Sequence, residues 1–385
     1  MNEWPMVKLG ELLKPSPKKT AGELDAPILS ITMHDGLVEQ GTRFKKRIAS
    51  LDTSIYRIVF KGQLVVGFPI DEGVLDFQDK YSQALVSPAY GVWDLVSDEV
   101  TPEFLGLFLK SPRAISIYKS RLRGTTARRR SLPTKVFQEI EFPLPPLGEQ
   151  KRIAEILGQT TKAISSVQNQ IEQVKKLRSS IVSTASKIAV ELRALSEYFD
   201  INPRQPRNIP DNAPTSFVPM ANLDETFGIS PIASQFSKHK KGYTYFENGD
   251  ILLAKITPCF ENGKSAIAKL STQIGHGSTE FHVLRHKNHM HQDVCLSPLL
   301  VAAILKQPSF LKPAENFMRG SAGQKRIPAS YIASLKVPVL KSVDLEQIDQ
   351  SLELVEALLN LYHRKLSLLQ ELQKSLATRA FAGLL

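Results

Sequence analysis

A seven-residue apolar repeat over residues 149–188 constrains this chain more than any other feature. Apolar side chains recur there in alternating steps of four and three residues, a spacing typical of helices that pack along a narrow seam. One helix of this length would extend about 60 Å, and its seam needs a partner. The same spacing returns from Leu345 to Ala380, without an intervening proline or glycine. The predicted seam residues are Leu157, Ile164, Val167, Ile171, Val174, Ile181 and Ile188 in the first segment, and Ile348, Leu352, Val355, Leu359, Tyr362, Leu366 and Leu369 in the second.

The two helical segments could pair with each other, or each could pair with another chain. Heptad spacing alone does not decide between these arrangements. A long helix without a coiled-coil partner is the simpler alternative.

An internal repeat favours pairing within the chain. Residues 58–68 resemble residues 245–255, residues 87–94 resemble 278–285, and residues 122–133 resemble 318–328. Each match is weak, but all of them occur in the same order, which indicates a tandem duplication of one unit, a globular domain followed by a long helix. Helices from such a duplication would pack antiparallel most simply.

The sequence therefore predicts an α+β protein. It would have two tandem globular domains joined by two long antiparallel coiled-coil helices, related by a pseudo-twofold duplication. The predicted segments are a first domain over residues 1–148, a central helix over 149–188, a second domain over 189–342 and a C-terminal helix over 343–382.

The charge balance points to a polyanionic partner. Lys and Arg number 49 against 38 Asp and Glu, which gives a net charge of +11 and favours nucleic acid or an anionic membrane surface. No stretch approaches the 18 or so apolar residues of a membrane span, so we expect no membrane association and favour nucleic acid. Two cysteines imply no disulfide framework, and we expect a cytoplasmic protein.

Basic clusters around small residues are the candidate DNA contacts. The most basic stretch surrounds Gly124, and its counterpart in the second half surrounds Gly320. Turns of this kind allow close backbone approach to phosphates, and guanidinium groups bind phosphate oxygens bidentately. A solvated charged surface is the alternative. The predicted contacts are Arg43, Lys45, Lys46, Arg47, Lys119, Arg121, Arg123, Thr125, Arg128, Arg129, Arg130, Lys238, Lys240, Lys241, Arg319, Ser321, Lys325 and Arg326.

Motifs for metal binding or catalysis are weak. Histidines gather between His276 and His291, but without the paired spacing of a zinc site, so we predict no metal. Gly263-Lys264-Ser265 ends like a phosphate-binding loop, yet Pro258 stands where that loop requires glycine. No nucleophile constellation recurs in both halves. We expect a non-catalytic protein without a cofactor of its own.

The chain resembles the specificity subunits of type I restriction–modification systems along essentially its whole length. The most specific similarities are FPLPPLGEQKRIAEIL at 142–157, GDILLAKITPCFENGKSAIA at 249–268, residues 273–285, and RGSAGQKRIP at 319–328. The resemblance implies that each globular domain reads one half of a split double-stranded DNA target and that the helices fix the spacing. It also implies two methyltransferase subunits, which bind S-adenosylmethionine, and a nuclease/translocase subunit as partners.

The alternative is a coiled-coil scaffold that assembles proteins without reading DNA. A scaffold gives no reason for a basic loop around glycine in both halves. An enzyme ranks third, because it would need a motif that the sequence does not contain.

Overall fold

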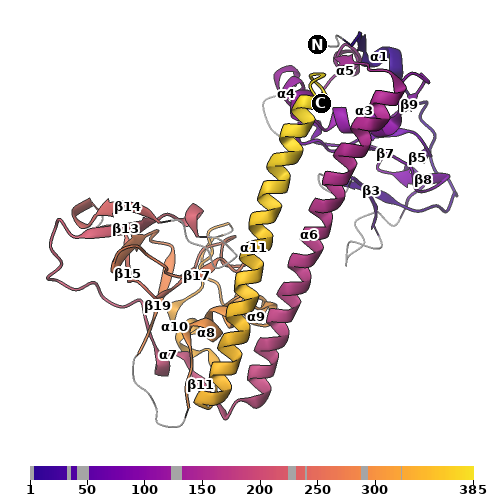
Figure 1. The fold of residues 1–385 in the computed structure, drawn as a ribbon. Helices are drawn as coiled ribbons and strands as arrows, with labels where there is room; N and C mark the ends of the chain where they lie inside the picture. The colour runs from indigo at the N-terminus through magenta and orange to yellow at the C-terminus, as the bar shows by residue number, and fades with distance from the viewer. Residues whose placement is uncertain are drawn as a thin grey trace. The chain divides into compact units, whose positions relative to one another are not determined.

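Two long helices, α6 (Leu147–Ile188) and α11 (Ser342–Ala380), dominate the computed structural model (Figure 1). The structure describes residues 4–32, 36–40, 52–122, 132–223, 231–238, 241–287, 294–321 and 323–385. The chain divides into two compact units, and each contains part of both long helices. Unit 1 comprises Met1–Ser166 with Ser367–Leu385, and unit 2 comprises Val167–Leu366. Each long helix is therefore divided between the two units.

The helices are antiparallel in both units. In unit 1, Gln373 Nε2 of α11 donates to Thr161 Oγ1 of α6 at 2.8 Å. In unit 2, Arg178 of α6 pairs with Glu356 of α11. From Thr161 to Arg178 the residue number rises along α6, while the number of the partner on α11 falls from Gln373 to Glu356, as antiparallel packing requires.

Unit 1 is built on a four-stranded sheet of order β2-β9-β6-β7, with two-stranded pairs β1-β10, β3-β4 and β5-β8. Its strands are β1 (Met6–Lys8), β2 (Leu13–Pro15), β3 (Leu29–Thr32), β4 (Gly36–Glu39), β5 (Arg57–Phe60), β6 (Leu64–Val66), β7 (Leu75–Phe77), β8 (Gln83–Val86), β9 (Gly91–Leu95) and β10 (Glu141–Pro143). Its shorter helices are α1 (Leu9–Leu12), η1 (Ile70–Glu72), α3 (Pro102–Leu109), α4 (Pro112–Arg121) and α5 (Thr134–Gln138).

Unit 2 repeats this plan with sheets β12-β19-β16-β17 and β14-β13-β18-β15 and the pair β11-β20. Its strands are β11 (Glu191–Ala194), β12 (Phe199–Ile201), β13 (Pro214–Val218), β14 (Ile232–Gln235), β15 (Thr244–Glu247), β16 (Ile251–Ala254), β17 (Ser265–Ile267), β18 (Ile274–Gly277), β19 (Phe281–His286) and β20 (Lys336–Val339). Its shorter helices are α7 (Leu195–Tyr198), η3 (Met220–Asn222), η4 (Phe236–Lys238), α8 (Pro298–Leu305), α9 (Pro308–Glu315) and α10 (Ala329–Ser334).

Strand registers confirm the duplication residue by residue. Leu64 of β6 lies opposite Trp93 of β9, and Ile251 of β16 lies opposite Leu284 of β19. These residues hold matching places in the aligned segments of the two halves. The predicted α+β fold with two related globular regions and two antiparallel helices is therefore confirmed.

The start of each unit's helical layer follows from local sequence. Thr101 and Ser297 are the N-caps of α3 and α8, and each side chain accepts a backbone N–H from the first turn. A proline follows each cap, at a position where a helix does not need an N–H donor. The two halves thus use the same start signal.

The core of unit 1 is completed by the end of α11. Phe381 is 3% exposed, and its ring lies 5.6 Å from Phe104 and 5.3 Å from Phe108, both on α3. Arg113 Nη1 also donates to the carbonyl of Phe381 at 3.2 Å. Residues far apart in sequence therefore share one hydrophobic core.

Burial along the long helices differs in part from the predicted seam. Leu157, Val167, Ile171, Val174, Ile348, Leu352, Val355 and Leu359 are buried, whereas Ile164, Ile181, Tyr362, Leu366 and Leu369 are only half-buried. Ile188 was expected in the seam but is 43% exposed. Val182 and Ala185 are buried in its place, because this end of α6 also packs into the core of unit 2. A straight helix also drifts away from a strict seven-residue repeat.

Among the residues that the structure describes, no helix has the length and apolar character to span a membrane.

Candidate nucleic-acid interface

A hairpin carries the basic cluster of the second half. Arg319 and Arg326 pair across it, with N···O distances of 2.9 and 2.8 Å. Gly320 has φ +128°, and a Cβ there would lie 2.7 Å from the carbonyl oxygen of Gln324, so this glycine permits the close turn. The amide of Thr257 donates to the Lys325 carbonyl at 2.9 Å, which fixes the hairpin to the segment after β16.

Arg326 anchors this hairpin through its side chain. Its guanidinium donates to both carboxylate oxygens of Glu280, at 2.9 and 2.8 Å, and this hydrogen bonding lowers the pKa of Glu280. Arg319, Ser321 and Lys325 are exposed around the turn. The hairpin therefore presents two cations and a hydroxyl to solvent, while its third cation is engaged within the protein.

The first half offers fewer described cations. Lys119 and Arg121 are exposed in the last turn of α4, where cations complement the helix dipole. In the second half, Lys238, the last residue of η4, and Lys241 are exposed. The remaining predicted contacts lie outside the described residues: Arg43, Lys45, Lys46, Arg47, Arg123, Thr125, Arg128, Arg129, Arg130 and Lys240.

Lys255 is a cation that the sequence analysis did not select. It follows β16, and its carbonyl accepts the amide of Ile327 at 2.9 Å, at the base of the hairpin. Its charge contributes to lowering the pKa of Glu280 and of His282. Its place directly after the apolar run of β16 was the available signal, but a single lysine after a strand is common.

Equivalent positions of the two units hold hydrogen-bonded pairs with exchanged donor and acceptor roles. In unit 1, Gln63 Nε2 donates to Asp94 Oδ1 at 2.5 Å. In unit 2, the matching residues are Asp250 and Arg285, and the arginine donates to both carboxylate oxygens at 2.9 and 2.7 Å. The duplicated scaffold is therefore kept while its polar groups differ.

The histidines have structural environments. His276 is fully buried, and its Nδ1 lies 3.2 Å from Thr215 Oγ1. His282 is 5% exposed, and its Nε2–H donates to the carbonyl of Ile327 at 2.9 Å. Burial lowers the pKa of His282. The described part of the chain contains no group of three His, Cys, Asp or Glu side chains that could hold a metal ion, and His289 and His291 lie outside it.

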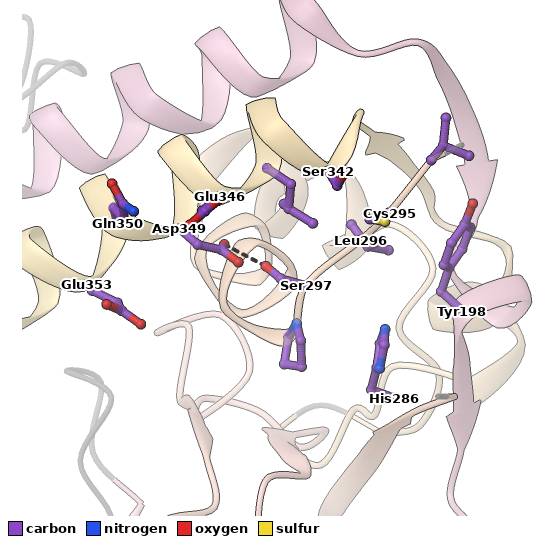
Figure 2. A pocket seen from close by; sticks show the side chains of 13 residues that line it. Tyr198, His286, Cys295, Leu296, Ser297, Ser342, Glu346, Asp349, Gln350 and Glu353 are labelled. Atoms are coloured by element: carbon purple, nitrogen blue, oxygen red, sulfur yellow. Dashed lines mark hydrogen bonds between the residues drawn. The ribbon is translucent and has the colours of Figure 1, made fainter. Parts of the chain in front are cut away.

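A cavity of about 700 Å³ lies beside the start of α11, and its acidic side chains would repel phosphate (Figure 2). Tyr198 and His286 line one part of it, and Glu346, Asp349 and Glu353 come from α11. Ser297 Oγ donates to Asp349 Oδ1 at 2.6 Å, and burial raises the pKa of Asp349. We do not include this cavity in the nucleic-acid interface.

Comparison with known proteins agrees with the duplicated fold. Residues 1–176 match the family model of the type I restriction modification DNA specificity domain. The chain is 41% identical over 147 residues to the specificity subunit of the type I restriction enzyme EcoEI from Escherichia coli, which covers 37% of this chain and 24% of that protein. It is 39% identical over 161 residues to the EcoAI specificity subunit from the same organism, covering 41% and 26%. The chain thus spans about a quarter of the length of these two curated relatives.

Solved structures extend the likeness in fold to nearly the whole chain. The S subunit of a type I restriction-modification system from M. genitalium matches with a TM-score of 0.56 and 14% identity, covering 98% of this chain and 96% of that one. A chain from a study of complex assembly in the type I R-M system matches with a TM-score of 0.50 and 17% identity, covering 100% and 99%. Residues 1–176 thus match the type I restriction modification DNA specificity domain, and the fold of nearly the whole chain is similar to that of a solved type I S subunit.

Proposed function

We propose that this chain reads a bipartite, gapped sequence in double-stranded DNA and positions methyltransferase subunits on it. Each globular region would contact one half of the target. Cations such as Arg319 and Lys325 would bind phosphates, and some cations would contact guanine edges in the major groove. The paired long helices would set the gap between the half-sites.

The duplication is the observation that carries this proposal. The sheet β2-β9-β6-β7 of unit 1 has a counterpart of the same strand order in β12-β19-β16-β17 of unit 2, with matching register between its two central strands. The polar residues on this shared scaffold differ. One scaffold with two unlike surfaces suits the reading of two unlike half-sites. The net charge of +11 supplies the general attraction to DNA.

The proposed partners follow from this role. Two methyltransferase subunits would bind the chain and supply S-adenosylmethionine, and a nuclease/translocase subunit would join them. The chain itself would act without catalysis. A protein-assembly scaffold that does not read DNA is the competing hypothesis, and the exposed cations on the hairpin of residues 319–326 favour the DNA reader.

Methylome sequencing tests the function directly. Cells that carry this gene with its neighbouring methyltransferase gene are compared with cells that lack this gene. We expect a new gapped motif with one methylated base in each half. A motif that is methylated equally without this chain would favour the scaffold. The scaffold would also be favoured if no motif is methylated and the purified complex binds DNA without salt dependence.

The hairpin of the second half can be tested by salt dependence. The Arg319→Ala/Lys325→Ala variant should weaken DNA binding by the methyltransferase complex and reduce the slope of log affinity against log salt by about 2. Lys365→Ala/Lys374→Ala on α11 removes the same charge from exposed positions outside the hairpin and is the control. Equal slopes for the two double variants would remove the hairpin from the interface.

The corresponding test in the first half is the triple variant Arg128→Ala/Arg129→Ala/Arg130→Ala. It should weaken binding most at low salt and flatten the dependence of log affinity on log salt, because three phosphate contacts are lost. Unchanged affinity across a salt series would show that these residues do not contact DNA.

A further inference from the structure

A charged pair is buried in the packed face of α6 and α11 in unit 2. Arg178 Nη1 lies 3.5 Å from Glu356 Oε1, and each side chain is only 9% exposed. Burial raises the pKa of Glu356, whereas the charge of Arg178 lowers it. The buried apolar residues along the same face of unit 2 are Val167, Ile171, Val174 and Val182 on α6, and Ile348, Leu352, Val355 and Leu359 on α11.

The apolar part of this face is repetitive and specifies the register weakly. A slip of seven residues replaces one apolar layer by the next and preserves most of the hydrophobic contact. The charged pair does not repeat in this way. In antiparallel helices, a seven-residue slip moves Glu356 next to Ala185 or Ile171, where its carboxylate would be buried without Arg178.

In a slipped register, Arg178 would move next to His363 in one direction and next to Asp349 in the other. In the register that brings Arg178 to the Asp349 carboxylate, Glu356 lies beside Ile171 and stays buried without its partner. Removing one partner of a buried ion pair leaves an uncompensated charge, which is strongly destabilising. Both slips are therefore disfavoured by the charges and tolerated by the apolar residues.

A neutral pair in unit 1 has the same register. Gln373 Nε2 donates to Thr161 Oγ1 at 2.8 Å, and the residue numbers of the two partners have the same sum as those of Arg178 and Glu356. The Thr161–Gln373 pair is exposed, so an alternative partner for either side chain is water. The buried pair thus carries the larger penalty for a slip.

We propose that Arg178 and Glu356 are positioning residues that select the register of α6 against α11. This inference rests on the proposed function where it concerns DNA, because the register would then determine the gap between the half-sites. A slip of seven residues displaces one helix by about 10 Å, which corresponds to about 3 base pairs. A single register would therefore give a single gap length.

The register can be measured without DNA. The reporter is the full chain with Thr161→Cys/Gln373→Cys, in a background in which Cys259 and Cys295 are changed to Ser. A short bifunctional thiol reagent should link the two reporter positions in the native register. After a seven-residue slip, the reporter positions would be too far apart, and the crosslinked fraction should fall several-fold.

The parent reporter is compared with three variants of the buried pair and with one control. The Arg178→Met/Glu356→Leu variant keeps an apolar packed face without the charges, and we expect it to fold, since such replacements of buried ion pairs are often neutral or stabilising. Its crosslinked fraction should fall several-fold. The charge-swapped Arg178→Glu/Glu356→Arg variant should crosslink like the parent chain, whereas Arg178→Glu alone should not.

The matched control is an exposed ion pair on the same helix. Lys175 Nζ lies 2.8 Å from Glu172 Oε1, with side chains 42% and 64% exposed. The Lys175→Met/Glu172→Leu change should leave crosslinking unchanged. If Arg178→Met/Glu356→Leu also crosslinks like the parent chain, domain packing alone sets the register and our inference is overturned. If that variant does not fold, failure of Glu356→Arg to restore crosslinking to Arg178→Glu overturns it equally.

The methylome of the same variants tests the consequence for DNA. We expect one gap length for the parent and charge-swapped chains, and additional gap lengths differing by about 3 base pairs for Arg178→Met/Glu356→Leu. Only the native gap length in that variant would refute the link to DNA spacing. Absence of any gapped motif in the parent chain would contradict the proposed function, while crosslinking would still decide the register.

Discussion

Gln150, at the start of α6, should be one of the most important polar residues for the stability of unit 1. The side chain is fully buried and makes three hydrogen bonds. Its Oε1 accepts the amide of Thr101 at 2.9 Å, and its Nε2 donates to the carbonyls of Glu99 at 2.7 Å and Pro145 at 2.8 Å. It therefore connects the start of α6 to the cap of α3.

Replacing Gln150 by Ala leaves one amide and two carbonyls without this partner. At about 1 kcal/mol for each unsatisfied group, we expect a loss of about 3 kcal/mol in the unfolding free energy of unit 1. The chain supplies its own control. Gln347 is the matching residue at the start of α11 and is exposed, so Gln347→Ala should change stability by less than about 0.5 kcal/mol.

Tryptophan fluorescence during urea unfolding measures this effect selectively. The chain has two tryptophans, Trp4 and Trp93, and both belong to unit 1. With a denaturant slope of about 2–3 kcal/mol per M, the midpoint should fall by about 1–1.5 M for Gln150→Ala. Equal midpoints for Gln150→Ala and Gln347→Ala would refute the argument that the buried hydrogen bonds stabilise this junction.

Three further predictions concern packing and protonation. Phe381→Ala should destabilise unit 1 by about 3–5 kcal/mol in the same fluorescence assay, whereas Leu384→Ala, at a half-exposed site, should have little effect. Because burial lowers the pKa of His282, folding favours its neutral form, and unit 2 should lose stability as the pH falls below about 6.5, by at most about 1.4 kcal/mol per pH unit. Hydrogen exchange of β19 should show this loss in the parent chain and a smaller one in His282→Gln; equal losses would exclude His282 as the cause. Gly277→Ala should lower the melting temperature, because its Cβ would lie 2.5 Å from a backbone oxygen, whereas Gly158→Ala, with open space in α6, should raise it slightly; shifts of the same sign would contradict this.

The repeat was predictable because short segments with similar residues follow one another in the same order in both halves. The strands of the shared four-stranded sheet and the short helices α3, α4 and α5 have counterparts of similar length in the other half, so even weak similarity kept the correct order. The exchanged pairs Gln63–Asp94 and Asp250–Arg285 show the limit of this approach. Their positions correspond, but a donor in one half replaces an acceptor in the other, and similarity of residue type does not reveal that.

The packed face of the long helices was predicted less completely. Arg178 is not an apolar residue and does not belong to the heptad pattern, although this side chain is buried in the face. Ala185 was also not predicted, because a small residue adds little to a hydrophobic pattern. Tertiary packing on the core of unit 2 decided which residues are buried at this end of α6.

The candidate interface was found through its composition, and its internal contacts were not. The basic residues around Gly320 are visible in the sequence, whereas the pairing of Arg326 with Glu280 joins positions 46 residues apart. Nothing local distinguishes the anchored Arg326 from the exposed Lys325. Geometry was needed to separate a structural cation from those available to a ligand.

The contribution of Phe381 to the core of unit 1 has a consequence for synthesis on the ribosome. Phe104 and Phe108 emerge long before Phe381 does. Translation at about 5–20 residues per second separates them by roughly 15–55 s. Unit 2 is continuous from Val167 to Leu366, so all its residues are available earlier than the complete set for unit 1. The region translated first would thus finish folding last, and its unfilled aromatic core would be open to chaperones or to aggregation in the interval.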